Sequence, residues 1–220
     1  VSHVSQYGST PLPVGTITAP QTTSSPSLSL TYDSRDNIFD PYRGWSHRWV
    51  GLVAGGPTPE IRFLGGDTSF YKAIYDVSYF RPSPFRLLPY IKPPSLALHS
   101  RAGRAWGFGG KDVPVVERFY LGGTDSIRGY SERILAGSLS SPIGGLAMWQ
   151  FNAELKWPIV QRIFTIALPF YDVGNTWTVP PPFKDINAST FPLAQSWGLG
   201  LRLTIPGTII VIRLDYGWPL

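Results

Sequence analysis

Residues 147–157 read "AMWQFNAELKW" and alternate between apolar and polar side chains from one end to the other. Because successive side chains of a β-strand point to opposite sides, this period of two predicts a strand with two different faces. Its length is close to the ~9–11 residues with which a tilted strand crosses a bilayer. The apolar face would hold Ala147, Trp149, Phe151, Ala153, Leu155 and Trp157, and the polar face Met148, Gln150, Asn152, Glu154 and Lys156.

The same period recurs along the chain, with mixed faces only in residues 45–54, and predicts about eight strands. They are expected at residues 27–33, 45–54, 69–80, 95–106, 147–157, 164–170, 196–205 and 208–216. Tight turns alternate with long connections at 107–145 and 178–194, which is typical of membrane barrels. Residues 81–94 are rich in proline and are predicted to form a loop. We expect residues 1–26, rich in Pro, Ser and Thr, to be an irregular or poorly ordered leader before a barrel segment at 27–220.

A soluble β-sandwich or a lipocalin-like barrel shows the same alternation, so the two faces alone do not say which of them meets water. Two observations favour a membrane barrel. Trp149, Trp157 and Trp197 stand near the ends of the apolar rows, as interfacial aromatic residues do. Charged residues make up only 15% of the 220 residues, against roughly 25% in soluble domains. The sequence therefore predicts an all-β, transmembrane antiparallel β-barrel whose apolar rows contact membrane lipids.

The composition argues against several other classes of protein. The chain has no cysteine, which removes disulfides, thiolate nucleophiles and cysteine-ligated zinc. Its three histidines, His3, His47 and His99, lack metal-ligand spacing, so no metal or other cofactor is expected. The net charge of +5 is not gathered in a Lys/Arg run, so nucleic acid is not a predicted partner. No phosphate loop or nucleophile elbow is present, and Asp33 and Asp36 fit a polar turn better than a catalytic pair, so we expect no enzyme.

Residues 118–130, "RFYLGGTDSIRGY", are too polar for a membrane strand and too rich in glycine for a helix. The end of this stretch resembles the loop-six signature of the BamA superfamily of outer-membrane assembly and translocation barrels, which includes TamA and the two-partner-secretion transporters. The family pattern is a glycine-rich lead-in followed by V/I-R-G-F/Y, and the matching residues are Gly122, Gly123, Ile127, Arg128, Gly129 and Tyr130. Four more stretches resemble the family in the same order: "DSRDN" with Pro41 and Gly44, "FNAELKWPI", "FYDVGNTW" and "GLGLRLTIPGTIIVIRLDYGWPL".

The resemblance implies a role for each residue of the signature. In the family the loop-six arginine folds back into the barrel lumen and meets acidic side chains on the two strands that follow, here Arg128 with Glu154 and Asp172. An arginine fork suits such carboxylates, while the glycines permit tight backbone turns and the tyrosine packs the loop against the wall. Two alternatives stay open: Arg128 could be a solvated loop arginine, and Glu154 could pair with Lys156.

Asp172 does not fit simple alternation. Counted from Phe164 through Ile166, Leu168 and Phe170, the apolar row would place Asp172 on the lipid side, where a charge is costly. Proline cannot donate to a β-ladder and often marks a bulge. We therefore predict a bulge at Pro169 that shifts the parity and turns Asp172 into the lumen.

The length of the chain limits how much of such a barrel it can form. A full family barrel has sixteen strands, so the chain supplies the C-terminal half, with loop six at 107–145 folded inward. A fragment of a longer protein is favoured over a natural half-size barrel, because the first residues form neither a signal peptide nor a capping domain. An eight-stranded barrel closes around its own side chains, which leaves little room for an inward-folded loop.

By resemblance, the last strand forms a lateral seam with the first. The residues expected there are Gly207, Ile210, Ile212, Leu214, Tyr216 and Gly217. A weakly paired edge is a template for an incoming strand. On this interpretation the loop-six contacts stabilise the wall opposite the seam.

The implied function is an outer-membrane barrel that inserts, assembles or translocates other proteins without enzymatic chemistry. Its expected partners are client β-barrel or secreted proteins, together with accessory assembly subunits and periplasmic repeats outside this chain. The expected location is the outer membrane of a Gram-negative-type bacterium, with an organellar outer membrane as the alternative. A passive outer-membrane pore or structural anchor barrel remains the alternative function, because it needs the same strands but not the contacts of Arg128.

Overall fold

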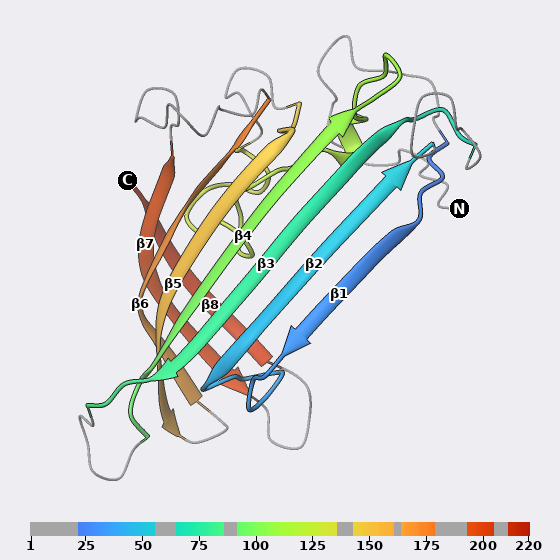
Figure 1. Ribbon diagram of the computed structural model, residues 1–220. Helices are drawn as coiled ribbons and strands as arrows, with labels where there is room; N and C mark the ends of the chain where they lie inside the picture. The colour runs from blue at the N-terminus through green and yellow to red at the C-terminus, as the bar shows by residue number, and fades with distance from the viewer. Residues whose placement is uncertain are drawn as a thin grey trace.

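The computed structural model describes residues 22–55, 65–85, 92–135, 143–160, 164–178, 193–204 and 211–220. Within them, eight strands form one antiparallel sheet in the order of the sequence (Figure 1). The strands are β1 (Ser27–Asp33), β2 (Gly44–Ala54), β3 (Phe70–Pro82), β4 (Ser95–Gly107), β5 (Ala147–Val160), β6 (Phe164–Trp177), β7 (Ala194–Thr204) and β8 (Val211–Pro219). A single 3-10 turn, η1 (Val115–Glu117), is the only helical element of this described part, in which no helix is long and apolar enough to span a bilayer.

The predicted strands are confirmed, with small shifts at most of their ends and one larger difference: β6 continues seven residues beyond the expected segment 164–170, to Trp177. The loop expected from residue 81 begins later, because β3 continues to Pro82, which pairs with Ser95 at the last position of the ladder. Proline is tolerated there because a strand end needs no further N–H donor. β8 ends three residues beyond the expected segment, at Pro219. Residues 205–210 and most of the expected leader lie outside the described residues.

The connections between strands lie at two ends of the sheet. The loop between β4 and β5 is at the upper end in Figure 1, and the turns after β1 and β3 are at the lower end. β8 ends at the same end as the β4–β5 loop. β1 and β8 each pair with one neighbour, so the sheet formed by the described residues is open and has two free edges.

The two faces of the sheet are inverted relative to those of a soluble barrel. Apolar side chains such as Leu30 and Leu199 are 58% and 43% exposed, whereas Asp172 and Ser196 are completely buried. Burying polar groups inside while exposing apolar ones costs free energy in water but suits a barrel surrounded by lipid. The structure thus favours the membrane barrel over the soluble alternative.

The hydrophobic core lies between the β4–β5 loop and the inner face of the sheet. Phe119, Leu121 and Ile127 of the loop pack there against Phe70 of β3 and Met148 of β5, and all five side chains are at most 5% exposed. The loop therefore folds inward, as predicted, and its apolar residues anchor it to the wall.

The predicted bulge at Pro169 is confirmed. The β5–β6 pairing passes from Glu154↔Phe170 to Lys156↔Ala167, so residues 168 and 169 together face one residue of β5. The same shift occurs against β7, and Asp172 faces inward. The bulge also corrects one expectation, because Phe170 leaves the apolar outer row and is completely buried on the inner face.

Candidate functional site

The loop-six segment reaches the lumen through a tight turn. Gly123 has a φ of 95° and its N–H donates to the carbonyl of Tyr130 at 3.0 Å, which closes the turn around residues 124–129. A φ in this range is readily available only to glycine. Ile127 is completely buried in the core. Its packing fixes the position of the next residue, Arg128, next to the inner face of the sheet.

Arg128 is held by two carboxylates of neighbouring strands. Its Nε and Nη2 donate to Asp172 of β6 at 2.8 Å each, and its backbone N–H donates to the same carboxylate at 3.1 Å. Its Nη1 donates to Glu154 of β5 at 3.0 Å. The guanidinium also lies 3.4 Å from the ring centre of Phe170, a cation–π geometry, and the side chain is only 5% exposed.

The ion-pair network extends over β7 and β8, beyond the residues that the sequence predicted. Arg202 of β7 donates to both oxygens of Glu154, at 2.8 Å for the Nη2 bond. Asp215 of β8 lies 3.6 Å from Nη1 of Arg128 and accepts a hydrogen bond from Arg213. Three arginines therefore face three carboxylates, so the charges of the network balance, with Arg128 and Arg202 buried or half-buried and Arg213 exposed. Alternation in residues 196–205 and 208–216 puts Arg202 and Asp215 opposite the apolar rows, but nothing in the sequence specifies their partners.

The loop also touches the last strand directly. A Cβ on Gly129 would lie 2.9 Å from the backbone carbonyl of Gly217, so the two backbones cross in contact at these glycines. Tyr130 donates from its hydroxyl to the carbonyl of Gln195 at 3.2 Å, and Arg213 donates to the carbonyl of Thr124 at 3.0 Å. The expectation that loop six stabilises the wall opposite the seam is therefore wrong. Loop six contacts β5, β6, β7 and β8, because the bulge at Pro169 turns Asp172 toward Arg128 and because Arg213 reaches the loop from β8.

Of the residues expected at the seam, Ile212, Leu214 and Tyr216 point away from the loop and are exposed. Gly217 lies beneath Gly129. Gly207 and Ile210 fall outside the described residues.

The turn after β1 folds over the lower part of the lumen. Lys156 of β5 donates to Asp40 of this turn at 2.8 Å, so Lys156 pairs with the turn and not with Glu154. Burial raises the pKa of Asp36, but hydrogen bonds from the backbone N–H groups of Tyr42 and Arg43 outweigh it and lower that pKa overall. Asp36 therefore organises the turn, as its polar composition predicted.

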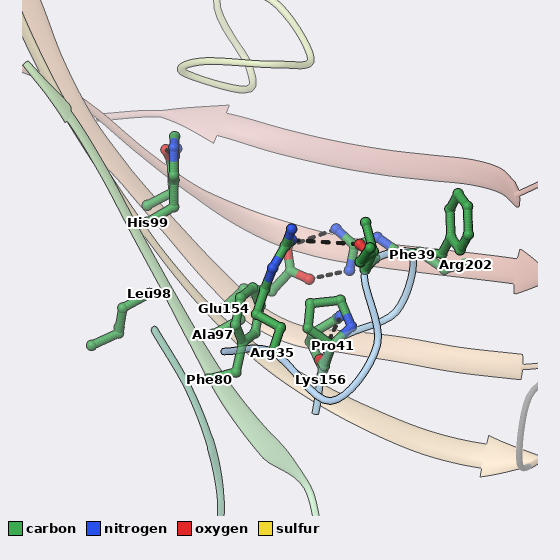
Figure 2. Close-up of a pocket in the computed structure, with 12 residues that line it drawn as sticks. Arg35, Phe39, Pro41, Phe80, Ala97, Leu98, His99, Glu154, Lys156 and Arg202 are labelled. Atoms are coloured by element: carbon green, nitrogen blue, oxygen red, sulfur yellow. Dashed lines mark hydrogen bonds and ion pairs between the residues drawn. The ribbon is translucent and has the colours of Figure 1, made fainter. Parts of the chain in front are cut away.

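A cavity of about 310 Å³ remains between this turn and the wall (Figure 2). Arg35 and Phe39 border it from the turn, and Glu154 and Arg202 meet at its side, as the dashed lines show. No cluster of three or more metal-ligating side chains occurs among the residues described. The site can thus fasten a loop through ion pairs.

Comparison with known families gives a match along almost the whole chain. The model of the Omp85 superfamily domain matches residues 6–220. The outer membrane protein assembly factor BamA of Nitratidesulfovibrio vulgaris is 30% identical over 198 residues, covering 88% of this chain and 22% of the relative. A SAM50-like protein of Schizosaccharomyces pombe is 32% identical over 189 residues, which cover 82% of this chain and 38% of that protein. The sorting and assembly machinery component 50 homolog of Mus musculus is 30% identical over 215 residues, or 90% of this chain and 41% of its own.

The fold is also similar to a solved structure, that of BamA from Haemophilus ducreyi lacking POTRA domains 1–3. The TM-score is 0.69 at 20% sequence identity, with 89% of this chain and 38% of that chain covered. At this identity the likeness concerns the fold alone. The chain spans between about a fifth and two fifths of the curated relatives described above.

Proposed function

Because the chain belongs to the Omp85 superfamily, we propose that it forms the C-terminal part of an outer-membrane barrel that inserts or assembles other proteins. The relatives named as assembly factors and as sorting and assembly machinery components support this proposal. The membrane is that of a bacterium or of an organelle, since relatives of both kinds match. The role is non-enzymatic, and its partners are membrane lipids, client β-barrel proteins and accessory subunits.

The observation that carries the proposal is the set of contacts around Arg128. A passive barrel needs its strands to pair, but it does not need a loop arginine that bonds to Asp172 and Glu154 and lies 3.6 Å from Asp215. Burying such charges is expensive unless each is matched. We propose that these contacts hold loop six, and with it strands β5 to β8, as one fixed wall of the barrel.

The proposed seam follows from the free edge of β8. In a bilayer every backbone N–H and C=O needs a partner, so the edge of β8 takes a further strand. Because Gly217 and Arg213 are in contact with loop six on the lumen side, we propose that β8 acts as a firm template for that strand. Ile212, Leu214 and Tyr216 would then line its outer, lipid-facing side.

A test replaces Arg128 with lysine in the full-length protein, expressed in cells depleted of the native copy. Lysine keeps the positive charge but loses the planar fork that bonds both carboxylates. We expect client outer-membrane proteins to fall at least about tenfold, equivalent to ~1.4 kcal/mol, while heat-modifiable gel mobility shows that the barrel remains folded.

Arg133→Lys is the matched control, because Arg133 is an exposed arginine of the same loop. Client levels should be unchanged in it. Normal client levels in a folded Arg128→Lys protein would leave the passive pore or anchor as the better interpretation.

A further inference from the structure

A row of polar side chains crosses the inner face of the sheet from β1 to β5, which lie side by side in Figure 1. The register of the strands sets its members directly opposite one another, and we call them the lumen row: Thr31, Arg48, Asp76, Arg101 and Gln150. The first four line one cavity of about 660 Å³, and Gln150 is buried on the inner face of β5. The lumen row therefore places one arginine on each side of a single carboxylate.

The two arginines are poorly matched by that carboxylate. Nε of Arg101 lies 3.4 Å from Oδ1 of Asp76 and is buried without a hydrogen-bond partner among the described residues. Nε2 of His99 lies 3.7 Å from the same oxygen. Arg48, directly across from Asp76 on β2, is exposed, and its guanidinium forms no hydrogen bond or ion pair with the part of the chain that the structure describes. Asp76 thus has several basic neighbours but, within that part, no short bond to either arginine.

The contacts of Arg128 show how a matched arginine is held in the same lumen. There the guanidinium donates to two carboxylates at 2.8–3.0 Å. A guanidinium carries five N–H donors and no acceptor, so Arg48 and Arg101 together have more donors than one carboxylate accepts. Two arginines beside one aspartate also leave one positive charge unbalanced. Arg35 borders the same cavity but does not add to this excess, because it is bound to Asp33 at 2.6 Å.

The cavity beside the lumen row suits an anionic ligand. Among the described residues that line it, Asp76 is the only carboxylate, and hydroxyl groups provide further donors: Ser29, Thr31 and Ser46. Its volume lies within the range of roughly 300–1,000 Å³ that is common for ligand sites. Arg35 and His99 also line the cavity drawn in Figure 2, so the two cavities meet at these side chains. The inner face of β1 to β4 therefore offers a polar space with an excess of positive charge.

The spacing of the two arginines selects the kind of anion. Neighbouring strands are about 4.8 Å apart, so the backbones of Arg48 and Arg101 are separated by about 10 Å, with Asp76 between them. A single small anion bound to both would lie over Asp76, which has the same sign of charge. Two separate carboxylates, one at each arginine, avoid that repulsion, and the planar arginine fork matches a carboxylate. Alternate residues of an extended peptide point to one side about 6.6 Å apart, and the long arms of the arginines cover the remaining distance.

We propose that the lumen row binds an extended, acidic segment of another polypeptide, with one carboxylate at Arg48 and one at Arg101. The inference rests on the proposed function, because a barrel that handles other proteins brings polypeptide to its lumen. The row lies on β2 to β4, whereas Arg128 contacts β5, β6 and β8. The acidic segment therefore binds at a site separate from the contacts that hold loop six.

The test titrates the detergent-extracted full-length protein into a fluorescein-labelled peptide in which glutamate alternates with serine, and measures fluorescence anisotropy at low salt. Arg48→Gln removes the unpartnered guanidinium, and we expect it to weaken binding about fivefold. Arg48→Gln combined with Arg101→Gln should weaken binding more than about tenfold. Asp76→Asn removes the like charge between the two arginines and should strengthen binding about threefold. Gel mobility of unheated samples verifies that each variant is folded.

Arg104→Gln is the matched control, because Arg104 is an exposed arginine of the same strand, three residues from Arg101 and so on the opposite face of the sheet. It should bind the peptide as the unmodified protein does. The proposal is overturned if Arg48→Gln binds normally, if Arg104→Gln weakens binding equally, or if Asp76→Asn weakens it.

Three comparison ligands test the chemistry of the site. The same labelled peptide with glutamine in place of glutamate should not bind, and equal binding would overturn the role of the carboxylates. A labelled oligothymidine that binds as tightly as the acidic peptide would overturn the assignment to a polypeptide. Displacement of the peptide by an equal concentration of inorganic phosphate would overturn the geometry of two separate carboxylates. Client levels are not part of these readouts, so a failure here leaves the Arg128→Lys test of the proposed function standing.

Discussion

Replacing Arg128 with alanine is the most direct perturbation of the lumen network. Asp172 accepts four hydrogen bonds, from Nε, Nη2 and the backbone N–H of Arg128 and from Asn152. Arg128→Ala removes the two from the guanidinium and leaves a completely buried carboxylate without its cation. Glu154 is affected less, because it keeps both bonds from Arg202.

The expected cost follows from these contacts. Breaking one partner of a buried ion pair costs about 3–5 kcal/mol, and the lower end applies here because Asn152 and the backbone N–H still solvate Asp172. We therefore expect the free energy of unfolding to fall by about 3 kcal/mol. With a urea slope of about 2 kcal/mol/M, the midpoint falls by about 1.5 M. Tryptophan fluorescence of the folded barrel in detergent, titrated with urea, measures this shift.

Two companion variants make the reasoning refutable. Arg133→Ala removes an exposed arginine that only stacks over Tyr120 at 4.0 Å, and it should cost less than about 1 kcal/mol. Adding Asp172→Asn to Arg128→Ala removes the stranded charge and should recover about 1–2 kcal/mol, since contacting sites are not additive. The stranded-charge argument is refuted if Arg128→Ala is within 0.5 kcal/mol of the unmodified protein in its free energy of unfolding. It is also refuted if the double variant Arg128→Ala with Asp172→Asn is no more stable than Arg128→Ala alone.

Two further substitutions test the other contacts in the lumen. Gly129→Ala is expected to cost at least about 2 kcal/mol and to open loop six to added protease, because φ is 88° and the new Cβ would lie 2.9 Å from the Gly217 backbone. Gly110→Ala, with a φ of 72° and open space around it, carries only the backbone strain and should leave loop six protected. Asp40→Asn is expected to lower the temperature at which the barrel loses its heat-modifiable mobility, because it deprives the buried Lys156 of its carboxylate. Asp125→Asn, at a carboxylate that is 95% exposed, should not change that temperature.

Local pattern was sufficient to predict the strands and one part of the site. Alternation in residues 147–157 placed Glu154 on the inner face because side-chain direction in a strand depends only on parity. In the next strand, Pro169 predicted a break in the alternation, since a residue without an N–H interrupts the ladder. Together with the resemblance of residues 122–130, these patterns predicted that Arg128, Glu154 and Asp172 lie together in the lumen.

The same local rules also account for what was missed. Phe170 was expected among the lipid-facing residues. The bulge covers residues 168 and 169, however, so the side chains of both Phe170 and Asp172 turn to the inner face. Arg202 and Asp215 were placed on the inner face, yet their partners could not be predicted, because parity gives the side of a strand and not the distance between strands.

The sequence by itself therefore determined the class of fold and the polar side of residues 147–157 and, through the family resemblance, the residue that loop six carries into the lumen. Only the tertiary structure decided that Glu154 is shared by Arg128 and Arg202, and that loop six crosses β8 at Gly129 and Gly217. The physical reason is range: side-chain alternation is set by neighbouring residues, whereas these contacts depend on the curvature of the sheet and on where an inward-folded loop comes to rest against it.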